Sequence, residues 1–234
     1  MLNNDLDFEP YRQQLAQRSR VQILDVLQAP AAERIRDCLQ REVPWTLAER
    51  SGGQPRTIPA ADLAAMPESD YRALLERAQL RAGSEFQFVY DSYMMRRAAI
   101  EGRDPGLLLH TVLDFMNSSE YLEFMRWFTG DARITEVNAQ ATRYRSGHFL
   151  TRHEDHDARE GRLYAYVLNL TPRWDADWGG LLQFLDGDGQ VIETLLPRWN
   201  SLSMFRVPQA HSVTLVAPWA GEHRLAITGW LLMR

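Results

Sequence analysis

The chain has 234 residues and a formal net charge of −5, and 45% of its residues are hydrophobic, which suits one well-buried core. All 26 basic residues are arginines, so enzymes that need a central lysine are excluded, including Schiff-base enzymes, pyridoxal-phosphate enzymes and Walker-type nucleotide hydrolases. The acidic balance gives no electrostatic reason to expect a nucleic acid or an acidic membrane surface as a partner.

The start of the chain and its cysteine content bear on its compartment. The first residues are mostly polar, and no apolar run reaches the length of a membrane span. Cys38 is the single cysteine, which excludes an internal disulfide. We therefore expect a soluble protein of the cytoplasm without a membrane partner. The sequence does not indicate an oligomeric state.

The first half of the chain predicts helices. Several segments carry apolar residues at helical spacing with charged residues on the opposite face. In the middle of the segment 105–129, residues Asn117 to Glu120 have the pattern of a capping box, which predicts the start of a helix that ends at Gly130. The predicted helical segments are residues 21–27, 31–41, 69–81 and 105–129.

Three short stretches interrupt these helices. Residues 43–48 and 86–90 are apolar and aromatic runs that predict added strands. Residues 50–59 are rich in glycine, proline and polar side chains, and we expect a mobile loop there. The helices are expected to buttress one outer face of the sheet that the rest of the chain forms.

The second half predicts a β architecture. Short runs rich in β-branched and aromatic residues alternate with glycine and proline breakers. Such spacing is typical of an antiparallel sandwich or barrel of the double-sheet jelly-roll class. Residues 186–189, Asp-Gly-Asp-Gly, predict a hairpin, and residues 133–145 can supply one or two further strands. The predicted strands are residues 163–170, 181–185, 191–196, 201–207, 212–216 and 225–232.

Two histidines and an aspartate are the strongest functional signal. His153 and Asp155 are two residues apart, so on an extended strand they share a face while Glu154 points away. His211 can join them if the segment between folds back and brings a second strand alongside. Two imidazoles and one carboxylate form the facial triad that holds a non-haem Fe(II) and leaves positions open. The pattern predicts an iron site.

The neighbouring polar residues permit other assignments. His156 and Asp157 are adjacent and would face opposite ways on a strand, so we expect them, like His148, to be solvated or to support the ligands. Arg224 comes after His211 and begins an apolar strand. It could form a surface ion pair, but on an apolar strand we expect its guanidinium to bind a buried anion.

The order of these motifs resembles that of 2-oxoglutarate/Fe(II) dioxygenases of the prolyl 4-hydroxylase type. The resemblance covers about residues 133–232, and the N-terminal half looks more like the cytosolic branch that modifies proteins of the translation machinery. The motifs are Tyr144-Arg-Ser-Gly147, His153-Glu-Asp155, Tyr166-Val-Leu-Asn169, Trp174, Gly179-Gly180, Pro197, Phe205, His211-Ser-Val213 and Arg224-Leu-Ala-Ile-Thr-Gly-Trp230.

The resemblance implies a fold and a domain organisation. The fold is an α+β, mainly β, double-stranded β-helix (a jelly roll, cupin-like), which agrees with the predicted strands. We expect one domain over residues 1–234. Residues 1–132 would form a mostly helical N-terminal buttress with one or two added strands, and residues 133–234 the catalytic core.

The resemblance also implies site roles. His153, Asp155 and His211 would bind Fe(II), and Arg224 would bind the C5 carboxylate of 2-oxoglutarate as a planar, two-pronged donor. Tyr144 and Thr228 would donate further hydrogen bonds to this cosubstrate. Val167 stands where some relatives have a tyrosine that also contacts the C5 carboxylate, which puts that contact in doubt. At the mouth of the barrel, Arg162 and Trp230 are the candidates for substrate contact.

The function that this implies is an oxidation. The enzyme would use Fe(II), 2-oxoglutarate and O₂ to hydroxylate a C–H bond of a prolyl residue in a protein, releasing succinate and CO₂, and ascorbate could stimulate it. The protein substrate could belong to the translation machinery. One alternative is a hydroxylase of a free amino acid or another small molecule. Another is a non-catalytic jelly-roll sensor or interaction module whose triad holds Zn(II) or no metal.

Overall fold

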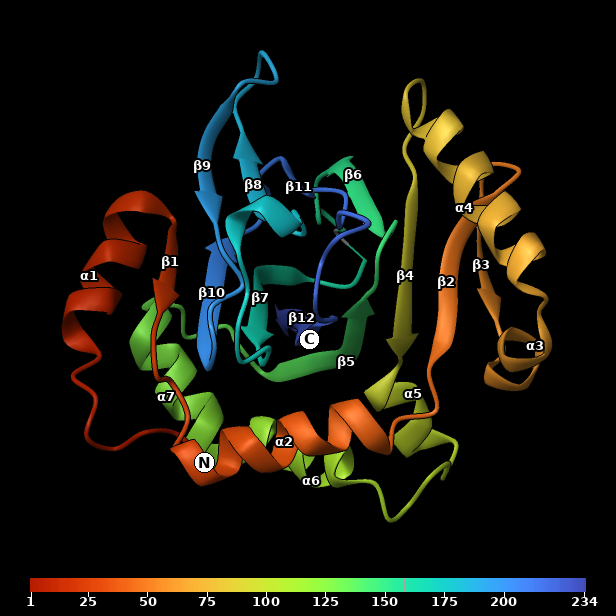
Figure 1. The fold of residues 1–234 in the computed structure, drawn as a ribbon. Coiled ribbons are helices and arrows are strands. Elements are labelled where there is room, and N and C mark those ends of the chain that lie inside the picture. The colour runs from red at the N-terminus through yellow and green to blue at the C-terminus, as the bar shows by residue number, and fades with distance from the viewer. Residues whose placement is uncertain (158) are drawn as a thin grey trace.

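A single antiparallel sheet runs through the computed structural model, which describes residues 1–157 and 159–234. The sheet has 12 strands, ordered β1-β10-β7-β12-β5-β4-β6-β11-β8-β9, with β2 and β3 added beside β4. The path curls into a nearly closed barrel, so that β1 and β9 at its two ends approach each other (Figure 1). An ion pair between Arg20 and Glu193 joins these two end strands.

The strands have the following bounds: β1 (Arg20–Ile23), β2 (Thr46–Ser51), β3 (Gln54–Ile58), β4 (Phe88–Tyr93), β5 (Glu136–Tyr144), β6 (Phe149–His153), β7 (Arg162–Asn169), β8 (Leu182–Leu185), β9 (Val191–Leu195), β10 (Ser201–Arg206), β11 (His211–Val213) and β12 (Arg224–Leu232). The helices are α1 (Glu9–Arg18), α2 (Ala29–Arg41), α3 (Ala60–Ala65), α4 (Glu68–Ala82), α5 (Met95–Ile100), α6 (Leu108–Met116), α7 (Ser119–Thr129) and the 3₁₀ helix η1 (Ala176–Trp178).

The β architecture of the second half is confirmed. The six predicted strands correspond to β7 to β12, although β11 ends at Val213, three residues earlier than expected. Residues 133–145 supply one strand, β5. The predicted hairpin joins β8 to β9, and its turn is held by Asp186, whose Oδ1 accepts hydrogen bonds from Asp188 N at 3.0 Å and Gln190 N at 2.8 Å.

Two predictions for the first half are wrong. Residues 21–27 do not form a helix. Residues 20–23 are the strand β1, which pairs with β10 and in which the alternate residues Val21 and Ile23 are buried. A short apolar run fits either structure, and here the neighbouring strand decides. Residues 50–59 are a hairpin rather than a loop, since β2 pairs with β3 from Leu47↔Ile58 to Ser51↔Gln54. The N-terminal half therefore adds four strands to the sheet instead of one or two.

The predicted helical segment over residues 105–129 contains two helices, α6 and α7, and the second begins and ends where the capping-box pattern and Gly130 predicted. Ser118 is the N-cap of α7, where its hydroxyl accepts a hydrogen bond from Tyr121 N at 3.3 Å, and Gly130 ends the helix with a φ of 69°. Asn117 is not the N-cap and instead contacts β5. Its side chain accepts a hydrogen bond from Val137 N at 2.9 Å and donates one to Val137 O at 3.0 Å. These bonds attach the break between α6 and α7 to the start of β5.

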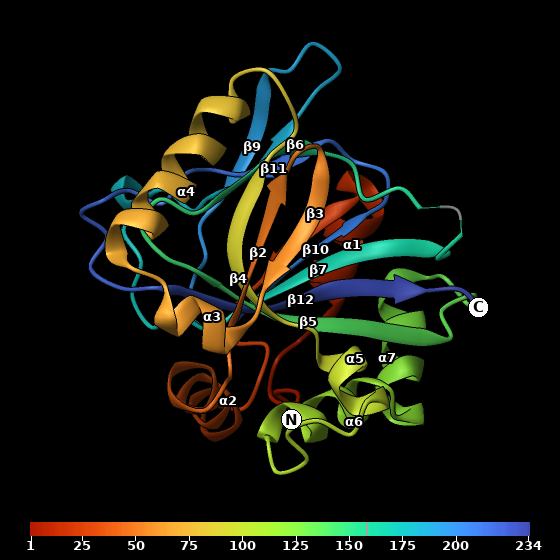
Figure 2. The ribbon, with the colours of Figure 1, turned by 90° about the vertical axis from the view of Figure 1, so that its right-hand side faces the viewer.

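Helices cover the outside of the sheet in two places rather than on one face (Figure 2). In the larger core, α2, α6 and α7 pack against β5 and β12 through side chains such as Leu39, Met125 and Ile227. In the smaller one, α4 packs against β2 and β4 around Leu47, Leu74 and Val89. Both groups of helices lie outside the barrel, and other side chains occupy its inner face. No helix in the described part of the chain combines the length and apolar character that crossing a membrane requires.

Candidate active site

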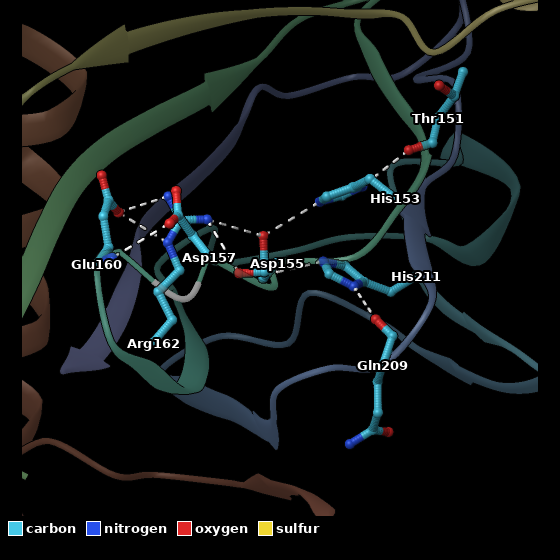
Figure 3. Close-up of polar contacts among 8 residues, drawn as sticks. All are labelled: Thr151, His153, Asp155, Asp157, Glu160, Arg162, Gln209 and His211. Atoms are coloured by element: carbon cyan, nitrogen blue, oxygen red, sulfur yellow. Dashed lines mark hydrogen bonds and ion pairs between the residues drawn. The ribbon is translucent and has the colours of Figure 1, made fainter. Parts of the chain in front are cut away.

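The structure brings His153, Asp155 and His211 together inside the barrel. β6 and β11 are antiparallel neighbours in which His153 is directly opposite His211, and directly paired residues point to the same face. Asp155 follows β6 and turns its carboxylate between the two rings (Figure 3). Its Oδ1 lies 3.6 Å from His153 Nε2 and its Oδ2 lies 3.5 Å from His211 Nε2. One potential ligand atom of each residue lies within 4.8 Å of the others.

Hydrogen bonds orient both imidazoles. Nδ1 of His153 lies 2.9 Å from the Thr151 carbonyl oxygen, and Nδ1 of His211 lies 2.8 Å from that of Gln209 (Figure 3). A carbonyl can only accept, so Nδ1 carries the proton in both rings and Nε2 keeps its lone pair. Each Nε2 faces the Asp155 carboxylate. The two imidazoles are thus oriented as metal ligands by hydrogen bonds to the backbone, and the Asp155 carboxylate lies beside both.

Burial keeps His211 uncharged at neutral pH. Its pKa is lowered to about 4, mainly because the ring is buried; His153 lowers it further, and the Asp155 carboxylate acts in the opposite direction. At pH 7 the imidazole is therefore neutral, and a proton does not compete for the lone pair that a metal ion needs.

A cavity of about 230 Å³ extends from this cluster into the barrel. Residues of β4, β5, β6, β7, β8, β10, β11 and β12 line it. Along β12 they are Arg224, Thr228, Gly229 and Trp230. Arg224 pairs with Tyr144 of β5, and Thr228 lies between Gln140 of β5 and Val167 of β7. The predicted cosubstrate and substrate residues thus share one cavity with the histidines and the aspartate.

Arg224 is a buried cation without an acidic partner among the described residues. It is 3% exposed, and its Nε and Nη1 are buried without a hydrogen-bond partner. Its Nη2 lies 3.5 Å from Asn169 Oδ1, and its guanidinium is 5.3 Å from the centre of the Tyr144 ring. Burial lowers the pKa of Arg224. Leaving a guanidinium in this state costs several kcal/mol, so an anionic ligand is expected to complete the site.

Tyr144 lies beside this cation. Its pKa is raised above the usual range, first by burial and then by the neighbouring Tyr90 and the Asp155 carboxylate, while Arg224 opposes the shift. The phenol therefore remains protonated and can donate a hydrogen bond. Thr228 lines the same cavity, and Val167, which pairs with it, presents no hydroxyl at that point.

Arg162 and Trp230 form one stacked unit in the cavity wall. The guanidinium lies 3.7 Å from the centre of the indole ring. Arg162 Nη2 lies 2.7 Å from Glu160 Oε2, and its Nη1 lies 3.9 Å from Asp155 Oδ1 (Figure 3). Trp230 Nε1 is buried without a hydrogen-bond partner. The stack thus links the wall of the cavity to the Asp155 carboxylate.

A row of aromatic side chains from the first half completes the cavity, and the sequence reasoning did not identify it. Phe86, Phe88 and Tyr90 line the wall, with ring centres 5.7 and 5.6 Å apart, and Tyr90 stacks on Tyr144 at 5.3 Å. At the other end, Phe86 lies 5.7 Å from the His153 ring. The signal was present in the sequence, because aromatic residues at every second position of a strand share one face.

The other polar residues considered with the histidines lie elsewhere. His148 is fully buried next to Tyr71, whose hydroxyl lies 2.6 Å from its Nε2, and burial lowers its pKa to about 3. Asp157 accepts a hydrogen bond from Arg159 N at 2.9 Å through its Oδ1. His156 is absent from the residues that line the cavity. The group of possible metal ligands found among the described residues contains the two predicted histidines and Asp155 alone.

Sequence comparison relates the core of the chain to a known superfamily. The sequence profile of the 2OG-Fe(II) oxygenase superfamily matches residues 139–232, which hold the three clustered residues, Arg224 and the strands around them. The matched segment is less than half of the chain, and it is similar to this superfamily, as the resemblance indicated. The name of the superfamily refers to Fe(II) and 2-oxoglutarate, and the cluster of His153, Asp155 and His211 offers ligand atoms that can hold a metal ion.

A prolyl hydroxylase is similar to part of this chain. The chain is 32% identical over 118 residues to a prolyl 3-hydroxylase, OGFOD1, of Xenopus laevis, a match that covers 46% of this chain and 22% of the relative. The matched region is thus about a fifth of the relative's length.

Solved structures are similar over almost the whole chain. A Pseudomonas putida prolyl-4-hydroxylase has a TM-score of 0.55 at 18% identity, covering 98% of this chain and 93% of that one. A Trichoplax adhaerens prolyl hydroxylase, solved with a peptide fragment of the hypoxia inducible factor oxygen degradation domain, has a TM-score of 0.58 at 14% identity, covering 97% and 89%. At these identities the likeness shows the fold, and the predicted jelly-roll class with flanking helices is confirmed.

Proposed function

We propose that the protein is a 2-oxoglutarate- and Fe(II)-dependent dioxygenase that hydroxylates a prolyl residue of a protein or peptide. One observation carries the proposal: a cavity holds a candidate metal-ligand cluster at one end and the unpaired guanidinium of Arg224 among its walls. The cluster suits a divalent metal ion and the guanidinium suits a carboxylate. A cosubstrate with a metal-chelating end and a distant carboxylate requires both.

In this proposal His153 Nε2, His211 Nε2 and the Asp155 carboxylate hold Fe(II). Bound Fe(II) and 2-oxoglutarate supply the O₂-dependent oxidation of a substrate C–H bond, with release of succinate and CO₂. Arg224 orients the cosubstrate through its C5 carboxylate, while Tyr144 and Thr228 donate hydrogen bonds to it. The aromatic and aliphatic walls exclude water from the reacting bond.

Charge balance supports this assignment. The formal charges of Fe(II), the Asp155 carboxylate, a doubly negative cosubstrate and the Arg224 guanidinium cancel. A buried site strongly favours such a neutral set over one that lacks a single member. A sensor that binds only Zn(II), or no metal, would leave Arg224 buried without its anion.

A prolyl substrate is favoured by the aromatic lining of the cavity. Phe86, Phe88 and Trp230 line the same cavity as the metal cluster, and aromatic side chains suit a pyrrolidine ring. Proteins similar to this chain are named prolyl hydroxylases, which points in the same direction. The N-terminal half contributes the β4 part of this wall, which supports the proposal of one domain over residues 1–234, with residues 133–234 as its catalytic core. A cytoplasmic location and a substrate in the translation machinery remain predictions from the sequence.

Two experiments test the proposal. Calorimetry with Mn(II) in place of Fe(II), followed by 2-oxoglutarate, should show 2-oxoglutarate binding that depends on the metal; its absence rejects the oxygenase. Mass spectrometry of host proteins with and without the enzyme should then find a proline that gains one oxygen atom only when the enzyme is present. A free amino acid that gains the oxygen, with proteins unchanged, would select the small-molecule alternative.

A further inference from the structure

A third arginine, Arg50, lies next to the cavity wall that holds Arg224 and Arg162, beyond the lining residues. β2 pairs with β4 so that Ala48 is opposite Tyr90 and Glu49 is opposite Val89. Glu49 and Val89 are buried on the outer side, against α4. Because successive residues of a strand alternate between faces, the Arg50 side chain leaves β2 on the same side as Ala48 and Tyr90. Arg50 also borders the hollow against α4 that Glu49 lines, and its guanidinium reaches the Phe86 ring of the cavity wall.

Arg50 continues the aromatic row of β4. Its guanidinium lies 5.5 Å from the centre of the Phe86 ring, and this ring in turn lies 5.7 Å from the His153 imidazole. One phenyl ring therefore separates the charge from a candidate metal ligand. A guanidinium stacked on a ring keeps its edge N–H groups free for a further partner.

The charge of Arg50 has no acidic partner among the described residues. Glu49, the nearest acid in the sequence, lies 3.6 Å from Arg56 on the neighbouring strand instead. Arg50 Nε is buried and has no hydrogen-bond partner. Arg162, the arginine on the β7 side of the cavity, differs because Glu160 pairs with it at 2.7 Å. Arg50 thus offers donors that the fold itself does not use.

We propose that Arg50, held on Phe86, binds a carboxylate of the substrate next to the residue that is oxidised. This inference rests on the proposed function and specifies its substrate. A carboxylate matches the donors of a guanidinium edge, and a partly desolvated pair of this kind is stronger than one in water. The carboxylate can belong to an aspartate or glutamate side chain near the proline, or to the C-terminal end of a substrate that stops there.

A peptide selection tests the inference and separates these two sources. Protein loaded with Mn(II) and 2-oxoglutarate is incubated with proline-centred peptide pools that have random flanking positions and an amidated C-terminus. A second set of pools ends in a free carboxylate at one to four residues after the proline. The retained peptides are sequenced for wild type, Arg50→Gln and the control Arg56→Gln. Arg56 lies on the same hairpin with its side chain 63% exposed and faces Glu49 rather than the cavity.

Wild type and Arg56→Gln should enrich Asp and Glu over Asn and Gln at one fixed offset from proline, by about tenfold, the usual worth of one charge-assisted hydrogen bond. Arg50→Gln should lose this preference. Enrichment only among pools with a free C-terminal carboxylate would assign the site to a chain end. A wild-type selection without acidic preference, or with the same preference in Arg50→Gln, overturns the inference.

Failure of the inference can be told apart from failure of the proposed function. The same wild-type preparation is titrated with 2-oxoglutarate in the presence and absence of Mn(II), without peptide. Metal-dependent binding of 2-oxoglutarate together with no acidic preference rejects the role of Arg50 and leaves the dioxygenase intact. Absence of 2-oxoglutarate binding rejects the dioxygenase itself, and the Arg50 inference that rests on it.

Discussion

The candidate metal cluster and the Arg224 region of the cavity differ in how many of their polar atoms have hydrogen-bond partners within the protein. Both histidines donate Nδ1–H to backbone carbonyls and turn their free nitrogens toward Asp155. Arg224, in contrast, has two buried nitrogens without partners. The metal cluster is therefore organised before anything binds, whereas the Arg224 region is completed only by a ligand. This difference predicts that metal binding does not need the cosubstrate, while cosubstrate binding needs both the metal and Arg224.

The largest effect is expected at the metal cluster. His211→Ala removes one of three ligands, so the affinity for Mn(II) should fall by about 100-fold or more, and 2-oxoglutarate binding should disappear with it. Calorimetry with Mn(II) measures the first loss and a following titration measures the second. His110→Ala serves as a control, because His110 Nε2 lies 3.0 Å from the Arg103 carbonyl oxygen and is not part of the cluster. Unchanged Mn(II) affinity in His211→Ala would refute the ligand assignment.

The next effect separates the two regions. Arg224→Ala should weaken 2-oxoglutarate binding by about 100-fold, because two charge-assisted hydrogen bonds are lost, and should leave Mn(II) affinity nearly unchanged. The same two titrations measure both numbers. If metal and 2-oxoglutarate affinities fall together, Arg224 acts on the fold of the site and not on the anion.

Removing the unpaired charge should also raise stability without ligands. Arg224→Met replaces a buried guanidinium with a shorter, flexible apolar chain, and the exchange of a buried charge for an apolar group can stabilise a protein by about 1 kcal/mol or more. Thermal unfolding of the ligand-free protein should therefore shift upward in the variant. After Mn(II) and 2-oxoglutarate are added, the wild type should gain more than the variant. A variant less stable than wild type without ligands would mean that the fold satisfies Arg224 by itself.

His148 provides a contrast with His211, since both are buried but only His211 faces the cavity. Burial lowers the pKa of His148 from 6.5 to about 3. Between these values the unfolded chain binds a proton that the folded protein does not, so His148 makes stability fall as the pH drops from 6.5 toward 3. The loss is on the order of 5 kcal/mol. Urea unfolding of His148→Gln should show a shallower decline over this range than wild type, and equal slopes would contradict the assignment.

The smallest effect is expected at Val167. Val167→Tyr places a hydroxyl beside Thr228 in the cavity wall, where one more hydrogen bond to the C5 carboxylate should tighten 2-oxoglutarate binding by roughly threefold to tenfold. Calorimetry on the Mn(II)-loaded protein measures the change, and Val167→Phe controls for the added ring. Equal affinities of the Tyr and Phe variants would show that the hydroxyl does not reach the cosubstrate.

The sequence predicted the metal cluster better than the rest of the cavity for a physical reason. His153 and Asp155 are linked by the two-residue period of a strand, which is local, and motif order pointed to His211 and Arg224. Residues 21–27 were mistaken for a helix because a short apolar run fits both structures until a partner strand selects one. Alternation placed Phe86, Phe88 and Tyr90 on one face, but Phe86 was not assigned to the site because only the pairing of β4 with β6 shows that this face lines the cavity.

The most direct test is a crystal structure of the protein soaked with Mn(II) and 2-oxoglutarate, with the metal located by its anomalous scattering. The account predicts one strong peak bound by Nε2 of His153, Nε2 of His211 and the carboxylate of Asp155, and a C5 carboxylate paired with the Arg224 guanidinium. Metal bound elsewhere, or 2-oxoglutarate that lies away from Arg224, would contradict it.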